Sequence, residues 1–167
     1  MIIQFGHNDV GRPDASSKFR GSVKGIGDET ETVTLADGKT EVVHSYGWYL
    51  KTFVRTARAK GANVILCSPI PHKKFDSAGK FVRDWTDFRG YVAACAKAEG
   101  ASYVDLCELI ARRYDKLTQP EIEALFADKG THTNDAGALL NARTLVAGLK
   151  DLPKNPLGTY FSAEATK

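Results

Sequence analysis

Short apolar runs alternate with helical patterns along this chain, and this alternation limits the folds that the chain can adopt. The runs cover residues 2–5, 63–67 and 102–104, and each leads into a loop or helix that carries polar groups. Strands that alternate with helices favour a parallel sheet covered by helices on both faces. The predicted class is therefore α/β, with a three-layer α/β/α arrangement.

The expected helices have apolar faces at helical spacing, residues that can cap their first turn, and glycines that can end them. One cap has the form of a capping box, Thr118-Gln-Pro-Glu121, in which hydroxyl and carboxylate satisfy free amides. The faces run over residues 46–57, 85–95, 106–117 and 138–149, with caps at Ser45, Asp84 and Asn134 and ends at Gly61 and Gly100.

Two segments depart from this alternation. Residues 10–44 form a long polar insertion, in which 32–35 and 40–43 flank the turn signal Ala36-Asp-Gly-Lys39 and predict a hairpin that serves as a lid or rim. Residues 151–167 contain prolines and polar residues and are expected to form a surface tail. The rest, 1–150, is expected to form a single domain.

Composition excludes several functional classes. The net charge is only +3, with 23 basic and 20 acidic residues intermixed, so no nucleic-acid partner is expected. No apolar run approaches the roughly 20 residues that span a bilayer, so no membrane partner is expected either. Cys67, Cys95 and Cys107 are predicted to be buried free thiols without metal-like clustering, and no metal or cofactor is expected. Because the chain opens directly on its first strand, it contains no recognisable signal peptide.

The motif Gly6-His-Asn-Asp9 follows the first predicted strand, at the sheet edge where parallel α/β proteins bind ligands. The Asn8 amide can donate a hydrogen bond to an oxyanion there, and Gly6 lets backbone and substrate approach closely. The alternative is a turn that uses both residues because they tolerate positive φ.

A carboxylate and an imidazole precede the last helix. The loop from Asp128 to His132 contains Gly130 and can bend to place the carboxylate beside the ring. Asp128 would then orient His132, which would act as a general base. The alternative is a pair of solvated loop residues, because single Asp-His pairings are common.

Together these motifs resemble the SGNH, or GDSL, hydrolases, in particular the rhamnogalacturonan-acetylesterase-like carbohydrate esterases. The resemblance rests on the segments Phe5-Gly-His-Asn-Asp9, Tyr46-Gly-Trp-Tyr-Leu50, Ser68-Pro-Ile-Pro71, Thr131-His-Thr-Asn134 and Ala136-Gly-Ala138. It implies a flavodoxin-like parallel sheet, Asn8 as oxyanion donor, His132 as base, Asp128 as its orienter, and removal of acetyl groups from a plant polysaccharide such as pectin without cofactor. It also suggests a secreted or periplasmic location.

Two departures from the family pattern shape our expectations. Three residues separate Asp128 from His132, where the family usually has two, and Gly130 can absorb the extra one. The family's Gly-Asp-Ser nucleophile segment does not precede Ile2, so the domain is expected to be N-terminally incomplete and its activity weak or absent. Ser68 is the candidate for a substitute nucleophile, and its Ser-Pro-Ile-Pro turn gives it a structural alternative.

The same departure affects the sheet and the partners. If the first strand is an edge in a sheet of about three main strands, its unpaired backbone groups favour a homo-oligomer. A non-catalytic carbohydrate-binding or assembly protein with the same fold is the alternative function. His72 and Trp85 are candidate substrate-binding residues, with a core position as the alternative for Trp85.

Overall fold

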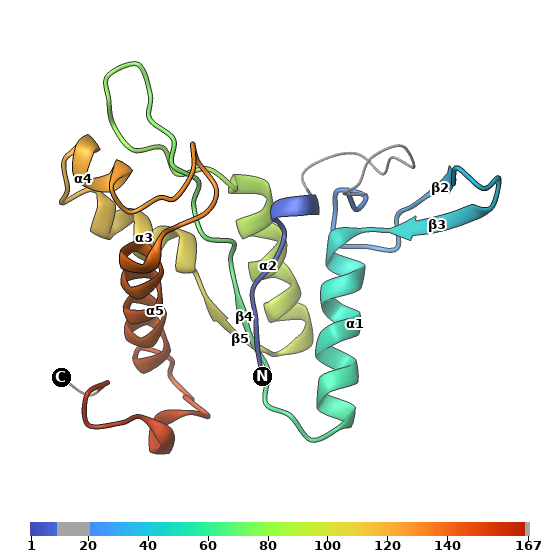
Figure 1. The fold of residues 1–167 in the computed structure, drawn as a ribbon. Coiled ribbons are helices and arrows are strands. Elements are labelled where there is room, and N and C mark those ends of the chain that lie inside the picture. The colour runs from blue at the N-terminus through green and yellow to red at the C-terminus, as the bar shows by residue number, and fades with distance from the viewer. Residues whose placement is uncertain (10–20, 166–167) are drawn as a thin grey trace. The chain divides into compact units, whose positions relative to one another are not determined.

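The computed structural model describes residues 1–9 and 21–165 (Figure 1). Its contacts divide the chain into two compact units. The first comprises Met1–Cys67 and Gly90–Tyr103, and the second comprises Ser68–Arg89 and Val104–Lys167. The prediction of one domain over residues 1–150 stays a prediction.

A three-stranded sheet has the order β1-β4-β5. It consists of β1 (Ile2–Ile3), β4 (Ile65–Cys67) and β5 (Ser102–Val104), with β1 parallel to β4 and Ile2 opposite Ile65. All of β4 is buried, as expected for a central strand of a parallel sheet. The predicted α/β class with about three main strands is confirmed, although two strands are shorter than the apolar runs that predicted them.

Helix α1 (Tyr46–Ala59) begins and ends at the predicted residues. The Ser45 side chain accepts a hydrogen bond of 3.0 Å from the amide of Trp48. At the other end Gly61 has a φ of 79°, a left-handed conformation that glycine adopts without strain. The buried face consists of Tyr46, Gly47, Leu50, Val54 and Ala57.

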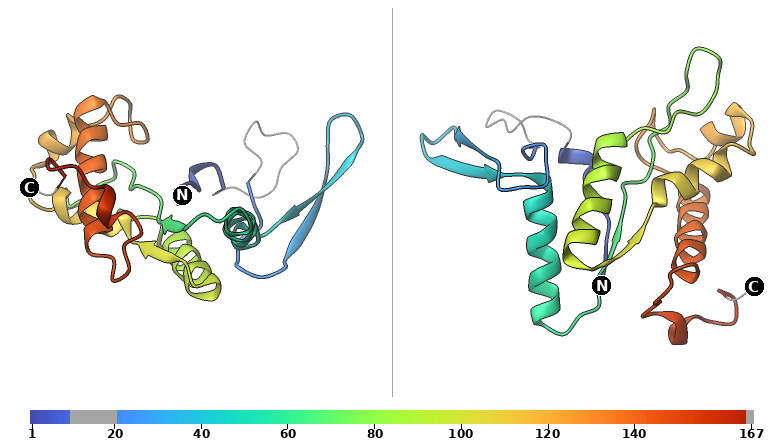
Figure 2. Two further views of the ribbon diagram at one scale, coloured as in Figure 1. Left: turned by 90° about the horizontal axis from the view of Figure 1, so that it is seen from below. Right: turned by 180° about the vertical axis from the view of Figure 1, so that it is seen from behind.

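Helix α2 (Thr86–Glu99) corrects one expectation, because Asp84 does not cap it. Trp85 lies between them with a φ of 67°, and its carbonyl accepts the first helical hydrogen bond, from Arg89. Trp85 therefore takes the cap position and frees the Asp84 carboxylate for another partner. In Figures 1 and 2 the later part of α2 runs beside α1, and the Glu99 carboxylate accepts two hydrogen bonds from Arg55.

The predicted hairpin is confirmed. Strands β2 (Thr30–Thr34) and β3 (Thr40–His44) pair antiparallel around a turn in which Gly38 has a φ of 81°. A lid or rim role stays a prediction. The part of the polar insertion over 10–20 lies outside the described residues.

The second unit contains α3 (Leu106–Tyr114), α4 (Gln119–Glu123) and α5 (Asp135–Lys150). The capping box of α4 forms as predicted, and the Glu121 carboxylate accepts hydrogen bonds of 2.7 Å from both the amide and the hydroxyl of Thr118. Asn134 caps α5 by accepting a hydrogen bond of 3.1 Å from the amide of Gly137, again as predicted. After α5 the tail contains a 3-10 turn at Gly158–Tyr160.

The three cysteines are free and buried, as predicted. Burial raises the pKa of Cys67 and Cys107 to about 12, so both thiols stay protonated at neutral pH. Among the helices of the described residues, none has the length and apolar character needed to cross a bilayer.

Candidate active site

In the first unit, the predicted oxyanion residues form a tight turn directly after β1. Gly6 is buried and has a φ of 141°, and the 3-10 helix His7–Asp9 follows it, closed by a 2.9 Å hydrogen bond from the Asp9 amide to the Gly6 carbonyl. Asn8 is exposed, and its amide makes no hydrogen bond to another described residue. The geometry is compatible with both roles that the sequence left open.

Tyr46 fixes the residue before this turn. Its hydroxyl donates a 2.8 Å hydrogen bond to the carbonyl of Phe5. Burial raises the pKa of Tyr46, so the hydroxyl keeps its proton at neutral pH and remains a donor. The Phe5 ring packs edge-on against Phe53 at 5.4 Å. Helix α1 therefore holds the entry to the Gly6 turn.

In the second unit, the loop before α5 brings Asp128 and His132 together. Nδ1 of His132 lies 2.5 Å from Oδ2 of Asp128. The other carboxylate oxygen accepts hydrogen bonds from the amides of Gly130, Thr131 and His132, at 2.8, 2.7 and 3.1 Å. The loop thus wraps around the carboxylate, and this accommodates the extra residue between Asp128 and His132.

This arrangement prepares the imidazole for proton transfer. The hydrogen bond from Gly130 and those from the ring and the other two amides hold the pKa of Asp128 well below its usual range. An ionised carboxylate at Nδ1 favours the tautomer with its proton on that nitrogen, which leaves Nε2 as the base. The His132 side chain is 80% exposed and that of Asp128 41% exposed, so the pair is open to a substrate.

Lys73 anchors this loop, although nothing local in the sequence indicated it. Its amide donates to the Gly130 carbonyl at 2.8 Å, and its ammonium donates to the Asp128 carbonyl at 2.9 Å. The ammonium also lies 5.5 Å from the centre of the Phe126 ring. These contacts join positions more than 50 residues apart in the chain, which a reading of spacing and periodicity does not detect.

A second histidine-carboxylate pair lies in the same unit. Nδ1 of His72 is 2.7 Å from Oδ2 of Asp84, and the His72 ring packs on Trp85 with centroids 4.7 Å apart. Trp85 is only 8% exposed, which supports its core alternative over contact with substrate. Substrate binding by His72 stays a prediction.

Ser68 has the contacts of a structural residue. Its side chain is fully buried, donates a 3.0 Å hydrogen bond to Oδ1 of Asp105, and accepts one of 2.9 Å from the amide of Cys107. A hydroxyl held in this way joins Ser68 to the start of α3. These contacts favour the structural alternative over a nucleophile.

The predicted site residues belong to both units. Gly6 and Asn8 lie in the first, whereas Ser68, Asp128 and His132 lie in the second, with His72 and Trp85. Over residues 1–9 and 21–165, no group of three or more histidine, cysteine or acidic side chains is arranged to hold a metal ion.

The amides of the Asp128 loop should report the carboxylate's titration. Because the pKa of Asp128 is lowered in the folded chain, its stabilisation of the loop is complete above the ordinary aspartate value of about 4. It is lost as pH falls through the lowered value. We expect the titration of the Asp128 carboxylate to move the NMR shifts of the Gly130 and Thr131 amides only below about pH 4. The same shifts moving near pH 4 would contradict this, and Asp128→Asn should abolish the transition.

Comparison with known proteins places these features in context. The model of the GDSL-like Lipase/Acylhydrolase family matches residues 1–140. A rhamnogalacturonan acetylesterase of Emericella nidulans is 31% identical over 138 residues, which are 83% of this chain and 55% of the relative. Rhamnogalacturonan acetylesterase RhgT of Bacillus subtilis is 23% identical over 166 residues, 91% of this chain and 61% of the relative.

A third relative, the probable rhamnogalacturonan acetylesterase YesY of Bacillus subtilis, is 23% identical over 157 residues, 91% of this chain and 62% of its own length. The chain thus spans only 55% to 62% of these relatives. A crystal structure of the Bacillus subtilis protein YxiM is similar with a TM-score of 0.56 and 31% identity, over 60% of this chain and 29% of that one.

Proposed function

The chain belongs to the GDSL-like lipase/acylhydrolase family, and on that premise we propose that it acts as an SGNH-type carbohydrate esterase that deacetylates a plant polysaccharide such as rhamnogalacturonan. The observation that carries the proposal is the 2.5 Å contact between Nδ1 of His132 and the ionised carboxylate of Asp128. The names of the three curated relatives support the choice of substrate.

In the proposed mechanism, Nε2 of His132 takes the proton of a serine hydroxyl, the one that the family resemblance places in a Gly-Asp-Ser segment. The serine oxygen bonds to the acetyl carbon, and Asn8 and Gly6 donate to the oxyanion that forms. The imidazolium then protonates the departing sugar oxygen. Water attacks the acetyl-serine by the same route and releases acetate, while Asp128 keeps the ring oriented throughout.

The proposal includes a low rate for this chain by itself. The pair Asp128–His132 supplies a base and its orienter, and neither is the nucleophile. Ser68 is buried and uses its hydroxyl to join Asp105 to Cys107. A catalytic unit loses most of its effect when one member is lacking. We therefore expect weak or no ester hydrolysis with Ser68 as the nucleophile.

Acetate release tests the proposal. The purified chain is incubated with acetylated rhamnogalacturonan fragments, with 4-nitrophenyl acetate, and with a methyl-esterified, acetate-free pectin as control. Slow release of acetate, insensitive to Ser68→Ala, is the expected result. Rapid hydrolysis that depends on Ser68, or methanol release from the control, would contradict the proposed chemistry.

The buried state of Ser68 also favours the second candidate, a non-catalytic carbohydrate-binding or assembly protein with the same fold. Its distinguishing result is binding of acetylated fragments, measured by calorimetry, with no acetate released over a day. Acetate release that His132→Ala abolishes would instead favour the esterase.

We further propose that copies of the chain associate through β1. In the described sheet β1 is an edge strand. Ile2 in this strand and Phe5 just after it both expose large apolar side chains. An edge strand with exposed apolar side chains favours pairing with a strand of another chain. Light scattering at micromolar concentration should give a dimer or larger species, and Ile2→Lys should give a monomer. Leu139→Lys, which changes an exposed leucine of α5, serves as control. A monomeric parent chain would overturn the proposal.

A further inference from the structure

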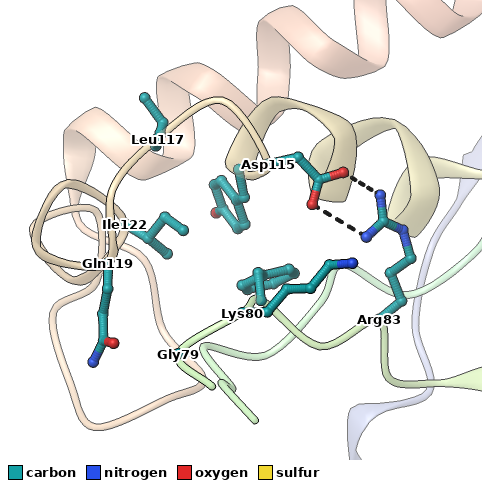
Figure 3. A pocket seen from close by; sticks show the side chains of 9 residues that line it. Gly79, Lys80, Arg83, Asp115, Leu117, Gln119 and Ile122 are labelled. Carbon is teal, nitrogen blue, oxygen red and sulfur yellow. Dashed lines mark hydrogen bonds and ion pairs between the residues drawn. The ribbon is translucent and has the colours of Figure 1, made fainter. Parts of the chain in front are cut away.

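A cavity of about 600 Å³ lies in the second unit, apart from the side chains of the Asp128–His132 pair (Figure 3). It is formed by the loop that ends at Arg83, by the end of α3 and by α4. Its volume falls within the range of small-molecule sites, about 300–1,000 Å³. The lining consists of Gly79, Lys80, Phe81, Arg83, Tyr114, Asp115, Leu117, Gln119 and Ile122.

Buried apolar side chains give this cavity a fixed wall. Phe81, Tyr114 and Ile122 are all buried, and the first two rings meet edge-on with centroids 4.9 Å apart. Aromatic pairs in this arrangement are stable and leave little freedom for the rings. The wall is therefore already ordered before a ligand binds, and binding does not incur the entropy cost of ordering these side chains.

The charges at the rim favour an anion. The Arg83 guanidinium is occupied, because both of its terminal nitrogens bind the Asp115 carboxylate and Nε binds Glu108 at 3.1 Å. Lys80 forms no ion pair within 4.0 Å of another described residue, but its charge attracts the Asp115 carboxylate and helps to lower the pKa of Asp115. Figure 3 shows its extended side chain along the cavity, directed toward the Arg83–Asp115 pair. The lining thus contains two cations and one anion, an excess of one positive charge.

Gln119 supplies an acceptor on the opposite part of the rim. Its amide nitrogen donates to Oε1 of Glu123 at 2.8 Å, so the amide is oriented and its oxygen remains available to a hydroxyl group. That oxygen lies 3.5 Å from where a Cβ on Gly79 would stand. Gly79 has a φ of 76°, so a side chain there would be strained, and the glycine keeps this part of the rim open.

We propose that this cavity binds a sugar residue that carries a carboxylate, with Lys80 on the carboxylate and the Gln119 oxygen on a hydroxyl. A single anionic group beside hydroxyl groups matches the one positive charge in excess, at Lys80, and the available acceptor oxygen of Gln119 across a preformed wall. The inference rests on the proposed function in taking the sugar to be a unit of the polysaccharide substrate. The loop 72–83 connects the two places, because Lys73 at its start holds the Asp128 loop and its end lines the cavity.

Binding measured without turnover tests this assignment. Digalacturonic acid is titrated into the full chain and followed by NMR and calorimetry, with galactobiose as the neutral control of equal length. Shifts should concentrate on residues 79–83 and 114–122, and galactobiose should bind about tenfold or more weakly. Lys80→Met should weaken the binding of digalacturonic acid by the same factor. Lys116→Met, which removes a charge just outside the lining, should leave binding within about twofold.

Gln119→Glu provides a second variant, which keeps the side-chain shape, replaces the hydrogen bond to Glu123 by a like-charge pair and adds a repelling charge to the rim. It should weaken binding of the acid more than binding of the neutral sugar. Equal binding of the two sugars, displacement by equimolar inorganic phosphate, or shifts elsewhere on the chain would overturn the proposal. Because these readouts do not depend on hydrolysis, loss of acetate release by His132→Ala leaves them unchanged. A chain that releases acetate but fails them has the proposed function without this subsite.

Discussion

Replacing Gly137 by alanine is expected to lower the free energy of unfolding by about 3 kcal/mol, an effect typical of overpacking at the severe end. A Cβ at this position of α5 would stand 2.2 Å from the carbonyl oxygen of Leu125 and 2.9 Å from Cβ of Thr133. The first contact is with backbone, which cannot move aside without shifting the chain that leads into the Asp128 loop. Urea denaturation of the two proteins measures the difference.

Gly90 provides the matched control. It also lies inside a helix, α2, but nothing stands within 4 Å of a Cβ placed there. Gly90→Ala should therefore raise the free energy of unfolding by about 0.5–1 kcal/mol, because alanine loses less backbone entropy on folding. Equal effects of the two substitutions would show that helix propensity, and not close packing, controls both positions.

Gly137 also connects packing to the candidate site. The Leu125 carbonyl that its Cβ would strike accepts a 3.0 Å hydrogen bond from the amide of Asn134, the cap of α5. The loop from Asp128 to His132 lies between these two residues in the chain. A small residue at 137 therefore lets the segments before and after the loop approach each other closely.

Local chemistry explains which parts of this fold the sequence predicted correctly. The caps Ser45 and Asn134 accept from amides three residues away, the Glu121 carboxylate accepts from the amide of Thr118, and the turn at Gly38 depends on its own φ. Signals of this kind are complete within a few residues. The hydrogen bond between Asp128 and His132 was predictable for the same reason, because the two residues are only four positions apart and Gly130 lets the loop between them bend.

Contacts between distant segments explain what was missed. Asp84 was expected to cap α2, but Trp85 adopts a left-handed conformation and the carboxylate binds His72. The anchoring of Gly130 by Lys73 was not predicted at all. Both contacts depend on the position of the loop over residues 72–85. Tertiary packing determines that position, and helical periodicity carries no information about it.

Replacing His132 by alanine should lower the slow acetate release of this chain to the rate measured without protein, because the imidazole is the proposed base for the attacking group. The measurement is release of acetate from acetylated rhamnogalacturonan fragments at neutral pH, at concentrations where the parent chain gives a rate above background. Lys129→Ala is the control, since this exposed residue lies in the same loop and outside the Asp128–His132 pair. Undiminished hydrolysis by the His132 variant would contradict its assignment as the base.

Asp128 makes the test specific to the pair. Asp128→Asn keeps the shape of the side chain but removes the charge that stabilises the imidazolium, and it should also lower the slow rate, toward that of His132→Ala. If the two residues act as one unit, the double variant should be no slower than His132→Ala alone, because the carboxylate has no role without the ring. Multiplied losses in the double variant would mean that Asp128 acts apart from His132. Its contacts with three loop amides would then be the main reason for its position.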